Sequence, residues 1–173
     1  KSEKFRFSLG QIISAEENRD MPSKSTLNEK MSDVIGETSI NFNENVKLTN
    51  SFLLDQNLEN FNKNKIELGM VYPKTNFNIS FLEESQHIGD TKYLKTNAGF
   101  NFNNGLISFG AKRNLLTNSA EFYDLSYEYL NDCLKAGIAY RREFYRDRDL
   151  EPEDSLIFKI TFSPLGTITS PAN

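Results

Sequence analysis

The stretch EFYDLSYEYLNDCLKAGIAY, Glu121–Tyr140, alternates apolar and polar residues on both sides of a short Asn-Asp turn. Every second residue before the turn is Tyr or Leu, and every second residue after it is Leu, Ala, Ile or Tyr. A period of two is typical of a β-strand with one apolar face, whereas an amphipathic helix has a period of 3.6. The stretch therefore predicts two antiparallel strands joined by a tight turn.

The same period extends along the whole chain and predicts an all-β protein of about ten antiparallel up-and-down strands. In the first five predicted strands the residues on the apolar face are Phe5, Phe7, Leu9 and Ile13, then Val34, Thr38, Ile40 and Phe42, then Val46, Leu48, Phe52 and Leu54, then Ile66, Leu68, Met70 and Tyr72, then Phe77, Ile79 and Phe81. In the last five they are Leu94, Thr96, Ala98, Phe100 and Phe102, then Ile107, Phe109 and Ala111, then Tyr123, Leu125, Tyr127 and Tyr129, then Leu134, Ala136, Ile138 and Tyr140, then Leu156, Phe158, Ile160 and Phe162.

These apolar faces contain no Asp, Glu, Lys or Arg, although such residues make up 25% of the chain. A basic side chain at mid-membrane on a lipid-facing strand costs about 2 to 4 kcal/mol, so a membrane β-barrel excludes charges in this way. A soluble sheet with one wet face excludes them too. The charge pattern alone leaves both possibilities open.

The connections between the predicted strands alternate between short turns and longer polar loops. The turns NEN, PKT, NNG and ND follow the second, fourth, sixth and eighth strands, and longer loops follow most of the others. Outer-membrane barrels have short periplasmic turns and longer extracellular loops. The rhythm therefore favours a segment of a transmembrane outer-membrane β-barrel.

The composition narrows the possible functions. The 173 residues carry a formal net charge of −4, with basic and acidic residues interspersed, so we expect no nucleic-acid partner. The chain has one histidine, His87, and one cysteine, and it shows no nucleophile motif or phosphate-binding glycine loop. We expect no enzymatic activity, no catalytic residues, no metal and no cofactor.

We expect residues 1–166 to form a single barrel segment and residues 167–173 to form a short C-terminal tail. The chain starts at Lys1 without a recognisable targeting segment, and its single cysteine has no partner within the chain. We interpret it as the C-terminal part of a larger barrel.

The region KRNLLTNSAEFYDLSYEYLNDCLKAGIAYRREFYRDRDLEPEDSLIFKITFSPLG, residues 112–166, resembles the C-terminal end of the LptD family (OstA/Imp) of outer-membrane lipopolysaccharide-assembly proteins. The earlier RFSLGQIISAEENRDMPSKSTLNEKMSDVIGETSINFNENVKL, residues 6–48, is similar to the preceding barrel strands of that family. The resemblance thus spans nearly the whole chain. It rests on the ordered set NLLTNSAEFYDLSYEY, NDC, YRREFYRDRDLEPEDS and a final FKITF strand followed by LG.

The resemblance implies a role in inserting lipopolysaccharide into the outer leaflet of the Gram-negative cell outer membrane. It implies lipopolysaccharide, an LptE-like plug lipoprotein and the periplasmic Lpt bridge as partners, the bridge being reached through an N-terminal jelly-roll that this chain lacks. It also implies that the barrel opens between its first and last strands.

Three groups of candidate site residues follow. The resemblance implies that Cys133 forms a disulfide with an N-terminal periplasmic region, and its parity, opposite to Leu134, points its thiol into the lumen. We expect the strand SLIFKITF to be the last one and to border the lateral seam, through Ser155, Leu156, Phe158, Ile160 and Phe162. Arg142, Arg146 and Arg148 belong to a loop rich in charges of both signs, and they contact either lipid phosphates through forked hydrogen bonds or the neighbouring carboxylates.

Two other functions stay open at this stage. An unrelated porin-like outer-membrane barrel would share the strand pattern and the loop rhythm. A soluble β-sheet binding protein would share the alternation of apolar and polar residues.

Overall fold

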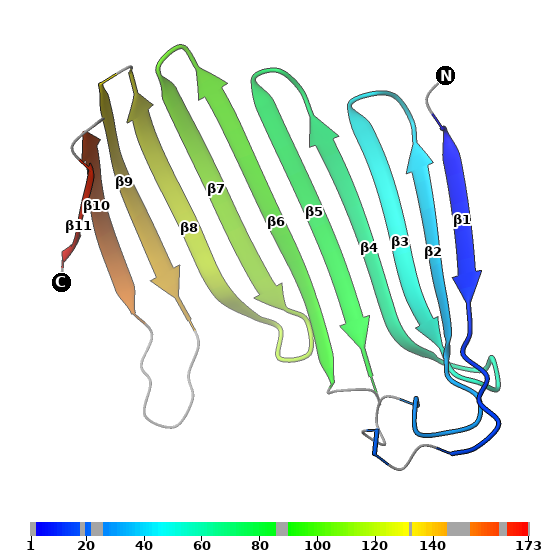
Figure 1. Ribbon diagram of the computed structural model, residues 1–173. Helices are drawn as coiled ribbons and strands as arrows, with labels where there is room; N and C mark the ends of the chain where they lie inside the picture. Colours follow the sequence, from blue (N-terminus) through cyan, green and yellow to red (C-terminus); the bar gives the residue numbers. More distant parts are fainter. Residues whose placement is uncertain are drawn as a thin grey trace. The chain divides into compact units, whose positions relative to one another are not determined.

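The computed structural model describes residues 3–17, 20–21, 26–85, 90–131, 133–144 and 153–162, together with the backbone of residues 166–172. This part of the chain forms eleven strands (Figure 1). Their bounds are β1 Phe5–Gly10, β2 Val34–Asn41, β3 Val46–Leu54, β4 Phe61–Val71, β5 Thr75–Glu84, β6 Thr91–Phe102, β7 Gly105–Asn114, β8 Ser119–Leu130, β9 Leu134–Glu143, β10 Asp154–Phe162 and β11 Gly166–Ala172.

The strands follow one another in the sheet in the order of the sequence, and every pairing with a described register is antiparallel. The predicted all-β, up-and-down fold is therefore confirmed. Among the described residues, no helix has the length and hydrophobicity that a membrane crossing requires.

The eleventh strand is a difference from the prediction, which assigned residues 167–173 to a tail. β11 pairs with β10 over the whole range from Leu156↔Ala172 to Phe162↔Gly166. The β-branched residues Thr167, Ile168 and Thr169 suit a strand. Because the segment has only one large apolar residue and contains a proline, it lacks the apolar alternation on which the prediction relied.

Most of the alternation of connection lengths is retained in the structure. The connections 72–74, 103–104 and 131–133 have two or three residues, and the connections 11–33, 55–60, 85–90 and 144–153 have six or more. The connections 42–45 and 115–118 have four residues each, so the two lengths do not differ there. In the connection 103–104, Asn103 adopts the positive φ, 34°, that asparagine tolerates better than most residues.

The chain divides into two compact units, residues 1–69 with 80–93 and residues 70–79 with 94–173. In the first unit the register places Phe5 opposite Ile40 and Ile40 opposite Leu48. Residues that are directly opposite each other point to the same face of a sheet, so this register confirms the predicted apolar face of β1 to β3.

In the second unit the register continues the apolar face across four strands. Ile107 pairs with Tyr127, Tyr127 with Ile138, and Ile138 with Phe158. Two residues further along each strand, Phe109, Leu125, Tyr140 and Leu156 are opposite one another in the same way. The predicted apolar faces of these strands are thus confirmed.

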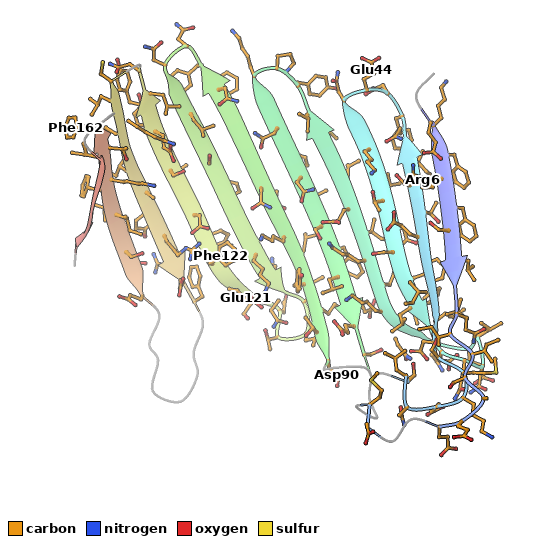
Figure 2. All side chains as sticks on the ribbon, in the orientation of Figure 1. Arg6, Glu44, Asp90, Glu121, Phe122 and Phe162 are labelled. Atoms are coloured by element: carbon orange, nitrogen blue, oxygen red, sulfur yellow. The ribbon has the colours of Figure 1, made fainter. Side chains whose placement is uncertain are left out.

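Burial in the described residues is the reverse of that in a water-soluble domain. The buried hydrophobic residues are Val34 and Leu82. The buried polar residues are Ser32, Asp33, Ser39, Asn62 and Ser80. Soluble domains bury large aliphatic and aromatic side chains, whereas here many of these side chains are exposed, among them Phe162, which Figure 2 labels.

Candidate functional site

The apolar face of β7 to β10 is a continuous exposed surface. Leu125 is 53% exposed, Phe158 is 45% exposed and Phe109 is 42% exposed, although each is flanked by paired strands. An apolar surface of this extent on a soluble monomer marks a site of contact with a membrane or another protein.

A shallow groove of about 320 Å³ runs along this apolar face. Its apolar lining residues are Ile107, Leu125, Tyr127, Ile138, Tyr140 and Leu156. They come from β7, β8, β9 and β10, so antiparallel pairing in register is what assembles the groove.

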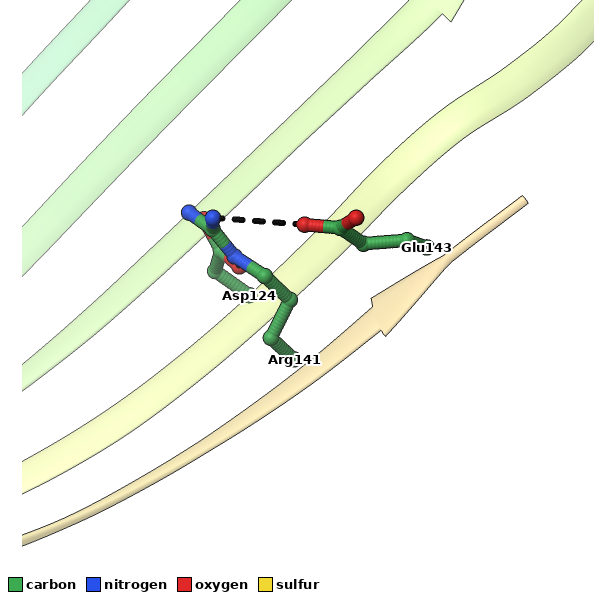
Figure 3. Close-up of polar contacts among 3 residues, drawn as sticks. All are labelled: Asp124, Arg141 and Glu143. Atoms are coloured by element: carbon green, nitrogen blue, oxygen red, sulfur yellow. Dashed lines mark hydrogen bonds and ion pairs between the residues drawn. The ribbon is translucent and has the colours of Figure 1, made fainter. Parts of the chain in front are cut away.

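The opposite face of β8 and β9 carries an ion-pair cluster built on Arg141. The Nε and Nη2 groups of Arg141 donate to the two carboxylate oxygens of Asp124 at 2.5 and 2.9 Å, and Nη1 donates to Glu143 at 3.4 Å (Figure 3). Asp124 and Arg141 are direct cross-strand partners. A forked guanidinium–carboxylate pair is geometrically specific, so this cluster favours one register of β8 against β9.

A β-bulge in β8 adds to the cluster. Lys112 pairs with Phe122 and Arg113 pairs with Ala120, so Glu121 is an extra residue in β8 (Figure 2). The carboxylate of Glu121 lies 2.6 Å from the Lys112 amine, and the Phe122 ring lies 5.3 Å from the Arg141 guanidinium. Bulges change the direction of side chains in this way. Here Glu121 and Phe122 both contact cations of the polar face, Lys112 and Arg141.

A second ion pair on this face joins Lys135 of β9 to Glu128 of β8, 3.1 Å apart. Exposed ion pairs of this kind are typical of a water-facing surface that is polar but has little net charge. The predicted apolar faces exclude charged residues, which places Asp124, Glu128, Lys135 and Arg141 on the other face, but the sequence does not identify their partners. Parity assigns a residue to a face, whereas partners depend on the register between strands.

In the first unit, buried hydrogen bonds attach the long connection 11–33 to the sheet. Asp33 is 2% exposed, and its carboxylate accepts a hydrogen bond of 2.8 Å from the Asn62 amide of β4. Its backbone N–H donates to the Thr26 hydroxyl at 3.0 Å. The sequence alone does not reveal this cluster, because a single Asp before an apolar run is typical of an ordinary loop residue.

Cys133 lies at the short turn between β8 and β9 and is exposed. The side-chain oxygen of Asn131 accepts hydrogen bonds from the backbone N–H groups of Cys133 and Leu134, at 2.9 and 2.8 Å. An Asx turn of this kind fixes the backbone without using the thiol. The thiol is thus exposed at the end of the hairpin, while its lumenal orientation and its disulfide both stay predictions.

Among the three candidate loop arginines, Arg142 lies within the described residues, in β9. Its Nε group lies 3.5 Å from the Asp154 carboxylate, and its guanidinium lies 5.1 Å from the Phe144 ring. Arg146 and Arg148 lie outside the described residues. Their predicted contact with phosphates or carboxylates stays a prediction.

The strand of the predicted seam residues is not the last one. Ser155, Leu156, Phe158, Ile160 and Phe162 all lie in β10, which pairs with β9 on one side and with β11 on the other. Phe158, Ile160 and Phe162 are exposed on the apolar face, at 45%, 42% and 41%. The end of the strand order is β11, so the predicted position of the terminal edge is wrong by one strand.

Metal binding has no candidate among the described residues. No group of three or more His, Cys, Asp and Glu side chains there could hold a metal ion.

Comparison with known proteins gives one family. Residues 1–123 match the family model described as LptD: LPS transport system D. This range covers most of the chain and ends within β8. It includes the strands that the sequence analysis took as the earlier part of the resemblance. No curated protein matches the chain at a significant level.

Proposed function

Because the chain belongs to the LptD family of LPS transport system D proteins, we propose that it forms part of an outer-membrane β-barrel that inserts lipopolysaccharide into the outer leaflet. In this proposal the chain is a transport component of the Gram-negative cell outer membrane and has no enzymatic activity. Family membership rules out the unrelated porin-like barrel that the sequence alone left open.

The observation that carries this proposal is the reversed burial. Large apolar side chains are exposed along one face, and the buried positions are mostly polar. Lipid is the environment in which an exposed apolar face and a satisfied polar backbone are both favourable. In water, the same face would need another layer of protein to cover it.

The strand lengths support a membrane-spanning role. A tilted strand of about 9 to 11 residues crosses the hydrocarbon core of a bilayer. The strands β4, β5, β7, β9 and β10 have 11, 10, 10, 10 and 9 residues, and β6 and β8 have 12 each. We assign the shorter connections to the periplasmic side and the longer ones to the outside, following the rule for such barrels.

The partners in this proposal are those of the family. They are lipopolysaccharide, an LptE-like plug lipoprotein facing the polar surface, and the periplasmic Lpt bridge, reached through a jelly-roll outside this chain. We assign Cys133, on the periplasmic side, to a disulfide with an N-terminal periplasmic region. We assign β11, supported by β10, to one side of the lateral seam.

A pair of neighbouring substitutions tests the membrane assignment. Leu125 and Ser126 are adjacent in the middle of β8 and belong to opposite faces. In the full-length protein, we expect Leu125→Arg to destabilise the inserted state by about 2 to 4 kcal/mol, and Ser126→Arg to have little effect, because its side chain faces a wet lumen. The measurement is the fraction of folded protein in isolated outer membranes.

Equal recovery of the two variants would contradict the face assignment, and with it the proposed function. The matched pair has the same introduced residue and the same strand, so a general effect of a new arginine on expression cancels in the comparison.

A further inference from the structure

We propose that the loop-side end of β9 holds the phosphate of a lipid through Arg142, while an acyl chain of that lipid lies in the apolar groove of β7 to β10. This inference rests on the proposed function, because it needs the apolar face to be in contact with lipid. It concerns the outside of the sheet and not the polar face.

The register places Arg142 on the apolar face. Arg142 is the cross-strand partner of Tyr123 on one side and of Asp154 on the other. Two residues earlier in β9, Tyr140 is the partner of Leu125 and lines the groove. Arg141, between them in sequence, points to the other face and is paired with Asp124.

The spacing between the Arg142 guanidinium and the groove allows one lipid molecule to contact both. Two residues along a strand span roughly 7 Å. A chain lying between Leu125, Tyr140 and Leu156 would therefore place a headgroup phosphate beside Arg142. An apolar groove with the guanidinium of Arg142 beyond its end matches a phosphorylated lipid, whereas a free phosphate or sugar would leave the groove unused.

Arg142 is held in place but retains donors for a ligand. Its guanidinium lies against the Phe144 ring, and its Nε group makes an ion pair of 3.5 Å with Asp154. The two side chains are 53% and 55% exposed, so this pair is weak. Forked recognition of a phosphate can use the terminal Nη groups of an arginine, which the pair with Asp154 does not engage.

The test measures lipid retention on the full-length protein, purified from membranes in detergent. The probe is lipid A that carries two phosphates, compared with a lipid A from which the phosphates have been removed, and bound lipid is counted by native mass spectrometry. Arg142→Ala should lower retention of the phosphorylated probe about tenfold, the order expected for a lost charge-assisted hydrogen bond. Retention of the dephosphorylated probe should not change.

A matched control and a gain-of-binding variant sharpen the result. Lys159→Ala removes one positive charge from the opposite face of β10 and should leave retention unchanged. Asp154→Asn removes the competing carboxylate and should raise retention about two- to fivefold. Excess inorganic phosphate should not displace the lipid.

The inference is overturned if Arg142→Ala and Lys159→Ala behave alike, or if Asp154→Asn lowers retention, since that would make the ion pair purely structural. Both outcomes leave the proposed function intact when Leu125→Arg still blocks insertion. Failure of the Leu125 comparison would instead remove the membrane contact on which this inference depends.

Discussion

At the scale of single residues, two adjacent arginines of β9 show how parity assigns different roles. Arg141 forms a forked pair with Asp124 on the polar face, whereas Arg142 lies on the apolar face near the groove. The sequence analysis singled out Arg142, as part of a charged loop, and did not single out Arg141. Their separation follows from strand geometry, because successive side chains point to opposite faces.

Cys133 is the residue whose role can be tested most directly. In the full-length protein, we expect non-reducing electrophoresis to show a disulfide-dependent mobility shift that Cys133→Ser abolishes. The substitution should leave the turn intact, because the hydrogen bond to Asn131 comes from the backbone N–H of residue 133. Wild-type protein treated with reductant is the control, and a shift that persists in Cys133→Ser would refute the assignment.

At the scale of elements, the strands depend on close contacts that hydropathy alone does not reveal. The Phe52 ring of β3 lies over Gly36 of β2 and makes an edge-to-face contact of 5.8 Å with Phe61 of β4. β4 begins at Phe61, five residues before Ile66, the first residue of its predicted apolar face. The residues Asn62–Lys65 are polar, so the apolar alternation does not predict this part of the strand. It is stabilised by hydrogen bonds such as that from the Asn62 amide to the Asp33 carboxylate, which depends on the register.

Gly36 is the element-scale position most sensitive to substitution. A Cβ atom at Gly36 would lie 2.1 Å from Cζ of Phe52, so Gly36→Val must displace the ring. We expect a loss of about 1 to 3 kcal/mol in the free energy of unfolding, measured by urea titration of the folded protein in detergent micelles.

The matched control for this change is Gly10→Ala in β1, where no atom lies within 4 Å of the added Cβ. That substitution should be neutral or slightly stabilising. Similar losses at both positions would show that the Phe52 contact does not determine the effect.

At the scale of the whole molecule, few large apolar side chains are buried among the described residues. The buried hydrophobic residues are Val34 and Leu82, while large apolar residues line exposed faces in both units. Burial of apolar area is the main favourable term in folding, so on the proposed function lipid supplies the cover that these faces need.

We therefore expect the purified chain to stay monodisperse only in detergent or lipid. Size-exclusion chromatography with and without detergent micelles measures this directly, and circular dichroism reports the β-structure in each sample. A monodisperse, β-rich chain in plain buffer would favour the soluble binding protein and contradict the membrane assignment.

The sequence by itself determined the all-β class, the apolar faces and the alternation of turn lengths, because these depend on a local period of two and on turn-forming residues. Only the tertiary structure decided the partners. It paired β10 with β11, joined Arg141 to Asp124, attached Asp33 to Asn62 and placed Arg142 at the end of the groove. These contacts depend on the register between strands, which a single-strand pattern does not contain.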